Sequence, residues 1–361
     1  MTMMQSLDSS PGAASPGSTV ADVDTLEANL GKPSFRVGLK VIDHIDDGAA
    51  HWIAVSPLAF LAFCDDGSAR RAPVAAPTAV SMTLAGGAPG FASRQDRKSL
   101  RVPLDAIDDP ALARVGVAVG SLFLAPDVGE TLRINGRVRA VDAQALLVDV
   151  DECYVHCAKA LIRSAFWKAA PSRVDAPTLA AFAPLTPFMA LASFDPGNGA
   201  DVSPKGDPAG SMIRVGGRGL TYAERPGNRR ADSFRNILVQ PSVAAIALIP
   251  GSDQIAVVAG EASISNDEAR RAEWVVAGKT PLLTTSIALR EAAVRRSDAL
   301  ARADLWPVKP PADAPDPARL LVQHITSHEH RSAEFQELRE ALAVPGTMEK
   351  GLAESYRNNL Y

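Results

Sequence analysis

The sequence predicts a mainly β protein, with two tandem β-barrel domains, peripheral helices and a helical C-terminal tail. Three observations support this prediction. The body of the chain consists of short apolar segments divided by Gly, Pro and Asp. Landmark residues recur in the same order in its two halves. The length of 361 residues suits two domains of ordinary size plus tails.

Composition and charge exclude several classes of protein. Apolar residues make up 47% of the chain, but no uninterrupted run of 18 apolar residues indicates a membrane-spanning helix. The net charge of −4, with both signs mixed throughout, argues against a broad nucleic-acid-binding face. The first residues lack the basic and apolar regions of a signal peptide, and three cysteines do not make a disulfide framework. We therefore expect a soluble cytoplasmic protein with reduced thiols.

The N-terminal region predicts a flexible arm followed by a short helix. Residues 1–33 are rich in Ser, Pro, Gly and Ala and show no sustained periodicity, so we expect the arm to extend to about residue 36. Between Val37 and Val55, apolar residues recur at near-helical spacing. This segment is expected to lead into domain 1, which spans 37–168.

Two sets of strands follow, one in each domain. They are short, apolar or alternating, and bounded by residues that favour turns. In domain 1 the expected strands are Leu58–Phe63, Ala79–Leu84, Val115–Leu124, Thr131–Val141 and Ala145–Val150. In domain 2, which spans 184–306, they are Phe188–Ser193, Ser211–Val215, Leu220–Tyr222, Val243–Ile249 and Ile255–Ile264.

Prolines mark the two connections. Residues 169–183 are expected to be a linker, and 307–361 a proline-rich hinge followed by the tail. Beyond residue 318, apolar residues at i, i+3 and i+4 spacing predict one helix, and Met348–Tyr361 predicts a second.

Landmarks shared by the two strand sets predict an internal repeat. Pro57 and Pro187 lie 130 residues apart, each before an apolar strand. Gly136 and Gly260 lie 124 residues apart, and the segments that end at Trp167 and Trp306 lie 139 apart. Pro73 and Pro77 match Pro204 and Pro208 at a separation of 131. Insertions in loops would explain the drift in spacing, and we expect two homologous domains.

The residues best suited to bind a ligand or take part in a reaction lie in domain 2. Asp201–Gly210 contains a hydroxyl, a cation, two carboxylates and two glycines, and Arg225–Arg230 follows, with Asp232 and Asn236 after it. Paired arginines present forked donors that match phosphate oxygens. A bound flavin mononucleotide (FMN) needs such groups at its phosphate, and positive or hydrogen-bonding groups near its ring. The alternative is that these are ordinary solvated loop charges.

These segments resemble FMN-dependent flavoproteins of the pyridoxamine-phosphate oxidase type. The similarity lies in DVSPKGDPAG and RPGNRRADSFRNIL of domain 2, and in VGETLRINGRVRAVD and HCAKALIRSAFW of domain 1. It covers most of residues 37–306. The resemblance implies split β-barrels that pair, with each FMN held between two barrels and contacted by both. For this chain it implies an intramolecular pseudo-dimer, which could pair again as a homodimer.

The family resemblance has an early part and a late part, in the order of the family's single-domain sequence, and each part is intact in a different domain of this chain. Ser203, Lys205, Gly206 and Asp207 match Ala72, Val74, Ala75 and Ala76 of domain 1, so the early part is intact only in domain 2. Arg133, Asn135 and Arg137 match Val257, Ala259 and Glu261 of domain 2, so the late part is intact only in domain 1. One composite site therefore keeps both halves, and a single FMN is predicted.

The resemblance also implies roles for single residues. Arg229 and Arg230 are the phosphate candidates, and Ser203, Lys205, Gly206 and Asn236 also come from domain 2. Domain 1 is expected to contribute Arg133, Asn135, Lys159, Arg163 and Trp167. His156 is a weak catalytic candidate that would line the substrate side; a histidine satisfied at a strand end is the alternative.

A metal site is not expected. Cys153, His156 and Cys157 include ligand types that bind zinc, but a structural site normally needs four ligands and no CxxC pair supplies the rest. The leading hypothesis is an FMN-dependent oxidoreductase acting on a small molecule. Pyridoxamine 5′-phosphate is not the expected substrate, because the sequence shows no second phosphate-binding set. The competing hypotheses are a flavin-binding module without turnover and a haem-handling barrel.

Overall fold

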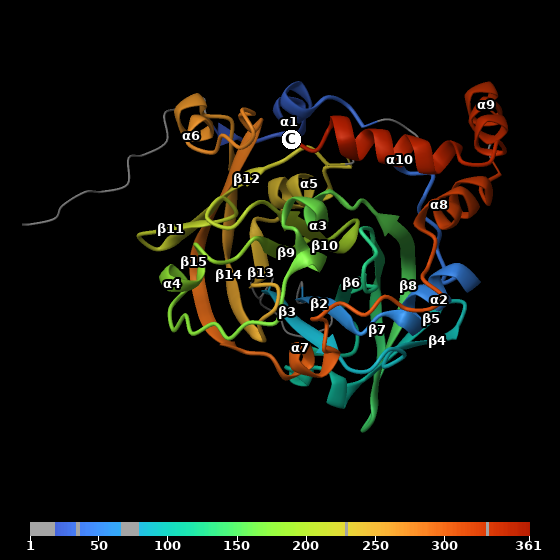
Figure 1. The fold of residues 1–361 in the computed structure, drawn as a ribbon, viewed down its shortest axis with the longest axis horizontal. Coiled ribbons are helices and arrows are strands. Elements are labelled where there is room, and N and C mark those ends of the chain that lie inside the picture. Colours follow the sequence, from blue (N-terminus) through green and yellow to red (C-terminus); the bar gives the residue numbers. More distant parts are fainter. Residues whose placement is uncertain (1–18, 34–36, 66–78, 228–229, 330–331) are drawn as a thin grey trace, which may run out of the picture.

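The protein is built on two antiparallel β-sheets with helices around them (Figure 1). A computed structural model describes residues 19–33, 37–65, 79–227, 230–329 and 332–361. Within these ranges no helix is both long and apolar enough to cross a membrane. The mainly β architecture with peripheral helices confirms the predicted fold class.

The sheet of domain 1 has seven strands in the order β3-β2-β6-β7-β8-β5-β4. Their bounds are β2 Leu58–Asp65, β3 Ala79–Gly86, β4 Ser93–Asp96, β5 Ser99–Pro103, β6 Ala118–Leu124, β7 Thr131–Val141 and β8 Ala145–His156.

The sheet of domain 2 follows the order β10-β9-β13-β14-β15-β12-β11, and a short strand β1 pairs with β14. Their bounds are β1 Thr19–Val20, β9 Phe188–Asp195, β10 Gly199–Gly206, β11 Arg214–Gly216, β12 Gly219–Glu224, β13 Ser242–Leu248, β14 Gln254–Ser265 and β15 Leu283–Arg296. Each strand of domain 1 has its counterpart at the same place in this order, as the predicted repeat requires.

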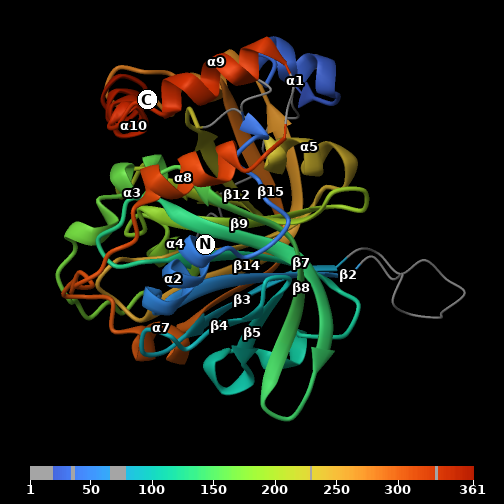
Figure 2. The same cartoon turned by 90° about the vertical axis from the view of Figure 1, so that its right-hand side faces the viewer.

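Helices connect and cover the sheets. The α-helices are α1 Val23–Leu30, α2 Asp47–Val55, α3 Lys159–Arg163, α4 Leu179–Phe182, α5 Asp232–Val239, α6 Glu268–Ala272, α7 Asp298–Ala303, α8 Pro317–Thr326, α9 Ala333–Leu342 and α10 Thr347–Asn358. Short 3-10 helices occur at η2 Leu104–Ala106, η3 Pro110–Leu112 and η4 Phe166–Lys168. Helices α8, α9 and α10 (red) gather on one side of the molecule (Figure 2).

The apolar runs of β2 and β9 reflect burial on both faces. Ala59, Leu61 and Phe63 of β2 point into the core of domain 1, whereas Leu58, Phe60 and Ala62 join a core shared with domain 2. Strand β9 behaves likewise, with alternate residues in the core of domain 2 and in the shared core. Successive side chains of a strand face opposite sides, so a strand between two cores must be apolar throughout.

Two related contacts join the domains across this shared core. Helix α3 of domain 1 packs on β10 of domain 2, where Arg163 Nε donates to Gly206 O at 2.7 Å. Helix α7 of domain 2 packs on β3 of domain 1, where Arg302 Nε donates to Gly86 O at 3.1 Å. Arg163 and Arg302 lie 139 residues apart in the sequence, the same separation as between the segments that end at Trp167 and Trp306. The domains therefore contact each other reciprocally, as the predicted pseudo-dimer requires.

The structure adds strands that the sequence pattern did not predict. Strands β4, β5, β10 and β15 were missed. Asp201–Gly206 lies between two expected strands, Phe188–Ser193 and Ser211–Val215, but it belongs to β10, which pairs with β9 along its length. Pro204 is tolerated there because β10 is an edge strand, where the missing N–H breaks no ladder.

Strand register corrects one part of the predicted repeat. Gly206 pairs with Phe188 at the start of β9, and Gly86 pairs with Leu58 at the start of β2, so Gly206 corresponds to Gly86. The counterparts of Ser203, Lys205, Gly206 and Asp207 are therefore Thr83, Ala85, Gly86 and Gly87. The predicted counterparts Ala72, Val74, Ala75 and Ala76 lie outside the described residues, in the connection between β2 and β3.

The segments outside the barrels carry more structure than the sequence predicted. Residues 19–30, assigned to the flexible arm, form β1 and α1, and Leu26 is buried; 1–18 and 34–36 lie outside the described residues. The linker contains α4, whose Phe182 is buried in the core of domain 2. The tail has three described helices rather than two, and the helix predicted from Val37 starts only at Asp47.

The reciprocal contact gives a test of the fold. A Cβ added to Gly86 would lie 2.2 Å from Ala299 O, a backbone atom that cannot rotate away. We expect Gly86→Ala to lower the free energy of unfolding by about 2 kcal/mol or more, as overpacking does. Gly216→Ala, which meets nothing within 4 Å, should change it by less than about 0.5 kcal/mol. Urea denaturation of both variants measures this, and equal stability would contradict the packing of α7 on β3.

Candidate functional site

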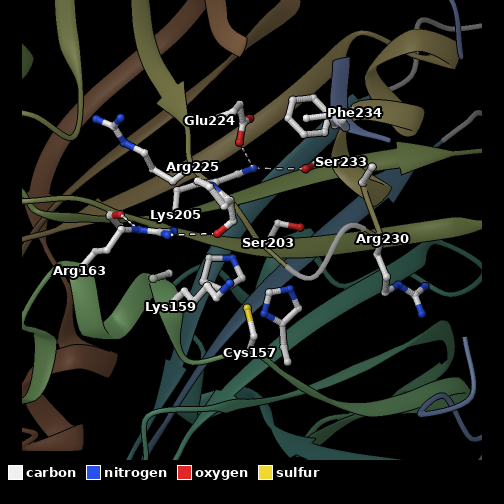
Figure 3. A pocket seen from close by; sticks show the side chains of 18 of the residues that line it. Cys157, Lys159, Arg163, Ser203, Lys205, Glu224, Arg225, Arg230, Ser233 and Phe234 are labelled. Atoms are coloured by element: carbon white, nitrogen blue, oxygen red, sulfur yellow. Dashed lines mark hydrogen bonds and ion pairs between the residues drawn. The ribbon is translucent and has the colours of Figure 1, made fainter. Parts of the chain in front are cut away.

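A cavity of about 600 Å³ lies between the domains (Figure 3). Domain 1 contributes the end of β8 and α3, domain 2 contributes β10, β12 and the start of α5, and residues after α10 complete the wall. The volume falls within the range of about 300–1,000 Å³ typical of small-molecule and cofactor sites.

The lining is rich in cations. Among the described residues of the lining, five basic side chains face two carboxylates, Glu224 and Asp232. The basic residues are Lys159 and Arg163 of α3, Lys205 of β10, Arg225 after β12, and Arg230 before α5. Lys159 and Arg163 are four residues apart and share a helix face, and Ser203 and Lys205 alternate on one face of β10. Local structure thus directs both pairs into the cavity.

Hydrogen bonds hold several of these cations in place. Arg163 donates to Leu360 O at 2.8 Å as well as to Gly206 O. Lys205 Nζ lies 2.8 Å from Glu224 Oε2 and 3.4 Å from Ser233 Oγ. Arg225 Nε donates to Asp207 Oδ2 at 2.7 Å. The cations are therefore fixed before any ligand arrives, which reduces the entropy lost on binding.

His156 and Cys157 lie where this cavity meets a second one of about 260 Å³. Burial lowers the pKa of His156 well below 6.5, with Arg133 and Lys40 adding to the effect, so the imidazole is neutral at pH 7. Its Nδ1 is buried and has no hydrogen-bond partner among the described residues. A buried nitrogen without a hydrogen-bond partner is rare in proteins, and it marks His156 as a candidate for a functional role.

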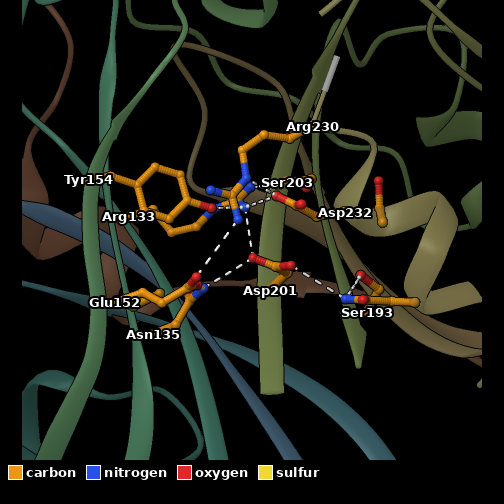
Figure 4. Close-up of polar contacts among 12 residues, drawn as sticks. Arg133, Asn135, Glu152, Tyr154, Ser193, Asp201, Ser203, Arg230 and Asp232 are labelled. Carbon is orange, nitrogen blue, oxygen red and sulfur yellow. Dashed lines mark hydrogen bonds and ion pairs between the residues drawn. The ribbon is translucent and has the colours of Figure 1, made fainter. Parts of the chain in front are cut away.

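Beneath the larger cavity lies a buried polar network that joins the domains (Figure 4). Arg133 of β7 is fully buried and donates to Asp201 Oδ1 at 2.7 Å, to Tyr154 Oη at 2.6 Å and to Ser203 Oγ at 3.0 Å. Asn135 and Asn236 also donate to Asp201, from domain 1 and domain 2 respectively. Burial raises the pKa of Asp201 and Arg133 opposes this rise.

The structure brings seven of the predicted site residues to the larger cavity and places others elsewhere. Ser203, Lys205, Gly206, Arg230, Lys159, Arg163 and His156 line it. Arg133, Asn135 and Asn236 belong to the buried network and not to the lining. Trp167 donates to Val128 O at 2.7 Å and packs on Phe166, away from the lining. Arg229 lies outside the described residues.

Three further lining residues were given no role from the sequence. Arg225 belongs to the basic segment Arg225–Arg230 that the sequence analysis names, beside Pro226 and Gly227, where a turn presents it. Glu224 and Tyr361 carry no sequence signal that separates them from surface residues. The Tyr361 ring lies 6.0 Å from the Arg163 guanidinium carbon and 5.7 Å from that of Arg225.

The corresponding place between β3 and α7 is occupied by side chains of the protein. Asp108 accepts from Ser297 Oγ at 2.5 Å and from Ala299 N at 2.7 Å. Asp109 pairs with Arg295 and accepts from Thr83 Oγ1 at 3.0 Å. Both carboxylates come from the connection between β5 and β6, which corresponds to the Arg230-bearing connection between β12 and β13. One interdomain site is open and cationic, whereas its counterpart is filled by acidic residues.

Comparisons with known proteins agree with the resemblance in domain 2. Residues 175–295 match the family model described as pyridoxamine 5′-phosphate oxidase. No curated protein matches the chain. The matched residues include β10 and β12, which form one side of the larger cavity.

Solved structures with weaker similarity are HupZ from Group A Streptococcus and General Stress Protein 26 from Bacillus anthracis str. Sterne. HupZ is 15% identical, with 31% of this chain and 86% of that chain covered, at a TM-score of 0.26. General Stress Protein 26 is 14% identical, with 31% of this chain and 89% of that chain covered, at a TM-score of 0.24. The H111A variant of HupZ is 14% identical, with 31% of this chain and 93% of that chain covered, at a TM-score of 0.26.

Removing a charge from the buried network should strongly destabilise the fold. Asp201→Asn leaves the buried Arg133 without its closest carboxylate, and breaking such a pair costs about 3–5 kcal/mol. Asp43→Asn removes an exposed pair with Lys98 and should cost less than about 1 kcal/mol. Denaturant unfolding at neutral pH measures both. A similar small effect for the two variants would mean that the network does not hold the domains together.

The second cavity gives a prediction for pH dependence. Burial lowers the pKa of Lys40 from 10.5 to about 8, although Cys157 and Asp232 oppose the effect. The unfolded chain therefore binds more protons between these pH values, and Lys40 makes the protein more stable as pH rises through them. As the pH rises from 8 to 10.5, the unfolding free energy of the wild type should therefore increase by on the order of 3 kcal/mol more than that of Lys40→Met, which lacks the titrating group. Urea unfolding across this range measures the difference; a constant difference would contradict the shift.

Proposed function

We propose that this protein is an FMN-dependent oxidoreductase that holds one FMN per chain between the late part of domain 1 and the early part of domain 2. The observation that carries the proposal is the interdomain cavity of about 600 Å³ with five basic side chains in its wall. The family match covers the strands of domain 2 that form one side of it.

The donor set fits the phosphate of FMN. A phosphate carries close to two negative charges at pH 7 and is best bound by forked, charge-assisted donors. Arg163 of domain 1 and Arg230 of domain 2 carry forked donors, and Arg230 Nε is held by Asp232 Oδ2 at 2.7 Å; Lys205 of β10 lines the same cavity. Because Arg163 and Lys205 are already held by hydrogen bonds, the protein would bind the phosphate without first ordering them.

The remaining lining suits a flavin ring and a small substrate. When bound, flavin supplies hydride transfer at its N5 position. Ser203 and Lys159 line the same cavity, and neutral His156 lies at the junction with the second cavity. In this proposal His156 hydrogen-bonds and orients the substrate, while the residues after α10 limit the access of water.

The filled counterpart supports a single FMN per chain. Asp108 and Asp109 place two carboxylates where a phosphate would have to bind, and they are already paired with Arg295, Ser297 and Ala299 N. Two phosphate charges would be repelled there. The chain thus behaves as a pseudo-dimer in which a single composite site is available.

The stoichiometry of FMN tests this proposal. The purified chain should retain about one FMN after titration and desalting, measured by its absorbance. Arg163→Ala should weaken FMN binding by about 10- to 100-fold, the value of a hydrogen bond to a charged group. Arg302→Ala is the matched control, because it removes the same contact with a strand at the filled counterpart and should leave binding unchanged. Two bound FMN per chain would refute the asymmetry of the two sites. The absence of bound FMN would refute the proposal that the protein is a flavoprotein.

Spectroscopy separates the enzyme from its alternatives. Substrate-dependent reduction of the bound flavin, or its reoxidation under turnover, supports an oxidoreductase. Tight FMN without any redox partner favours a flavin-binding module. A Soret band on addition of haem to FMN-free protein favours the haem-handling alternative.

A further inference from the structure

The second cavity, of about 260 Å³, lies between domain 1 and the C-terminal helices. We call it the tail chamber. Six apolar side chains form one part of its wall: Val37, Val155, Leu321, Ile325, Met348 and Leu352. Leu321 and Ile325 are four residues apart on α8, and Met348 and Leu352 are four apart on α10, so each helix presents one apolar face to the chamber.

Two buried lysines line the chamber: Lys159, which also lines the larger cavity, and Lys40, which faces the apolar wall. Lys40 is only 9% exposed, and its Nζ donates to Val155 O at 3.0 Å. Among the described residues no carboxylate is paired with it, and two of its three N–H donors remain for a ligand. Its ammonium also lies 5.1 Å from the centre of the Tyr154 ring. A buried ammonium without a carboxylate partner is costly unless something anionic binds it.

The chamber's own carboxylate does not serve this purpose. Glu130 Oε1 accepts a hydrogen bond from Tyr356 Oη at 2.6 Å, and burial raises the pKa of Glu130. Tyr356 in turn accepts from Ala158 N at 3.3 Å, so Glu130 is tied to α10 and to the start of α3. The positive charge of Lys40 is therefore left to face the chamber.

The tail chamber opens toward the proposed FMN site. His156, Cys157 and Lys159 line both cavities. A molecule in the chamber with its anionic group at Lys40 would extend along the aliphatic wall toward these three residues. Helix α8 also fixes the Lys40 segment, because the ring of buried His324 lies 3.2 Å, through Nδ1, from Lys40 O.

We infer that the tail chamber is the substrate site and that it takes a small carboxylate with a compact apolar body. The carboxylate binds Lys40, and the apolar body packs against Leu321, Ile325, Met348 and Leu352. Lys40 presents one ammonium that pairs with no carboxylate among the described residues, and this ammonium matches one negative charge, whereas a phosphate is best bound by several forked donors. This inference rests on the proposed function for the identity of the neighbouring cofactor.

The test compares 2-naphthoate with the uncharged 2-naphthalenemethanol by calorimetry on the FMN-loaded protein. Naphthoate should bind at least about tenfold more tightly, as expected for a hydrogen bond to a charged group. Lys40→Met should abolish this preference, and the matched control Lys309→Met, at an exposed lysine, should keep it. Leu352→Trp fills the chamber from a partly exposed helix position and should weaken both ligands at least about tenfold.

The results distinguish this inference from the proposed function. Equal binding of the two probes, no binding of naphthoate up to about 1 mM, or full preference in Lys40→Met would overturn the tail chamber as a carboxylate site. The FMN content of Lys40→Met and Leu352→Trp should stay at the wild-type value, because neither residue lines the larger cavity. If the wild-type chain holds no FMN, the proposed function fails, and the same titration of the FMN-free protein still decides the carboxylate site.

Discussion

The burial of β2 and β9 between two cores is the constraint on which the rest of the structure depends. Each strand uses one face for its own barrel and the other for the core that the domains share. Because both faces must be apolar, the strands cannot lie at a solvent-exposed surface, and the domains are held together as one body. This contact sets β10 against domain 1 and brings α3 to its end, which creates the cavity.

Polar groups within this apolar contact determine how the domains meet. Hydrophobic packing alone does not fix the relative orientation of the two sheets. Arg133, however, can donate to Asp201 only if β7 of domain 1 faces β10 of domain 2. A buried ion pair adds little net stability, yet a misplaced one is heavily penalised. The network therefore fixes the relative placement of the two sheets, and with it the positions of Ser203 and Lys205 in the cavity wall.

The two interdomain sites show how few residues separate an open cationic cavity from a closed interface. Both use a short helix packed on a strand, and both anchor it with an arginine that donates to a glycine carbonyl. In one site the neighbouring connection carries Arg230; in the other it carries Asp108 and Asp109, which bind the surrounding donors themselves. The tail lies beside the open site, where α8 and α10 contribute an apolar wall to a second cavity.

The sequence by itself determined the class of the fold, most of the central strands and the basic segment of domain 2. Apolar runs and turn residues are local signals, and Thr131–Val141 was predicted with the bounds that the structure shows. The tertiary structure decided what depends on distant neighbours. It set the register that pairs Gly206 with Phe188, buried Arg133 beneath the cavity, and left Lys40 facing an apolar chamber. Side-chain burial and strand register depend on contacts far apart in the chain, which local patterns do not encode.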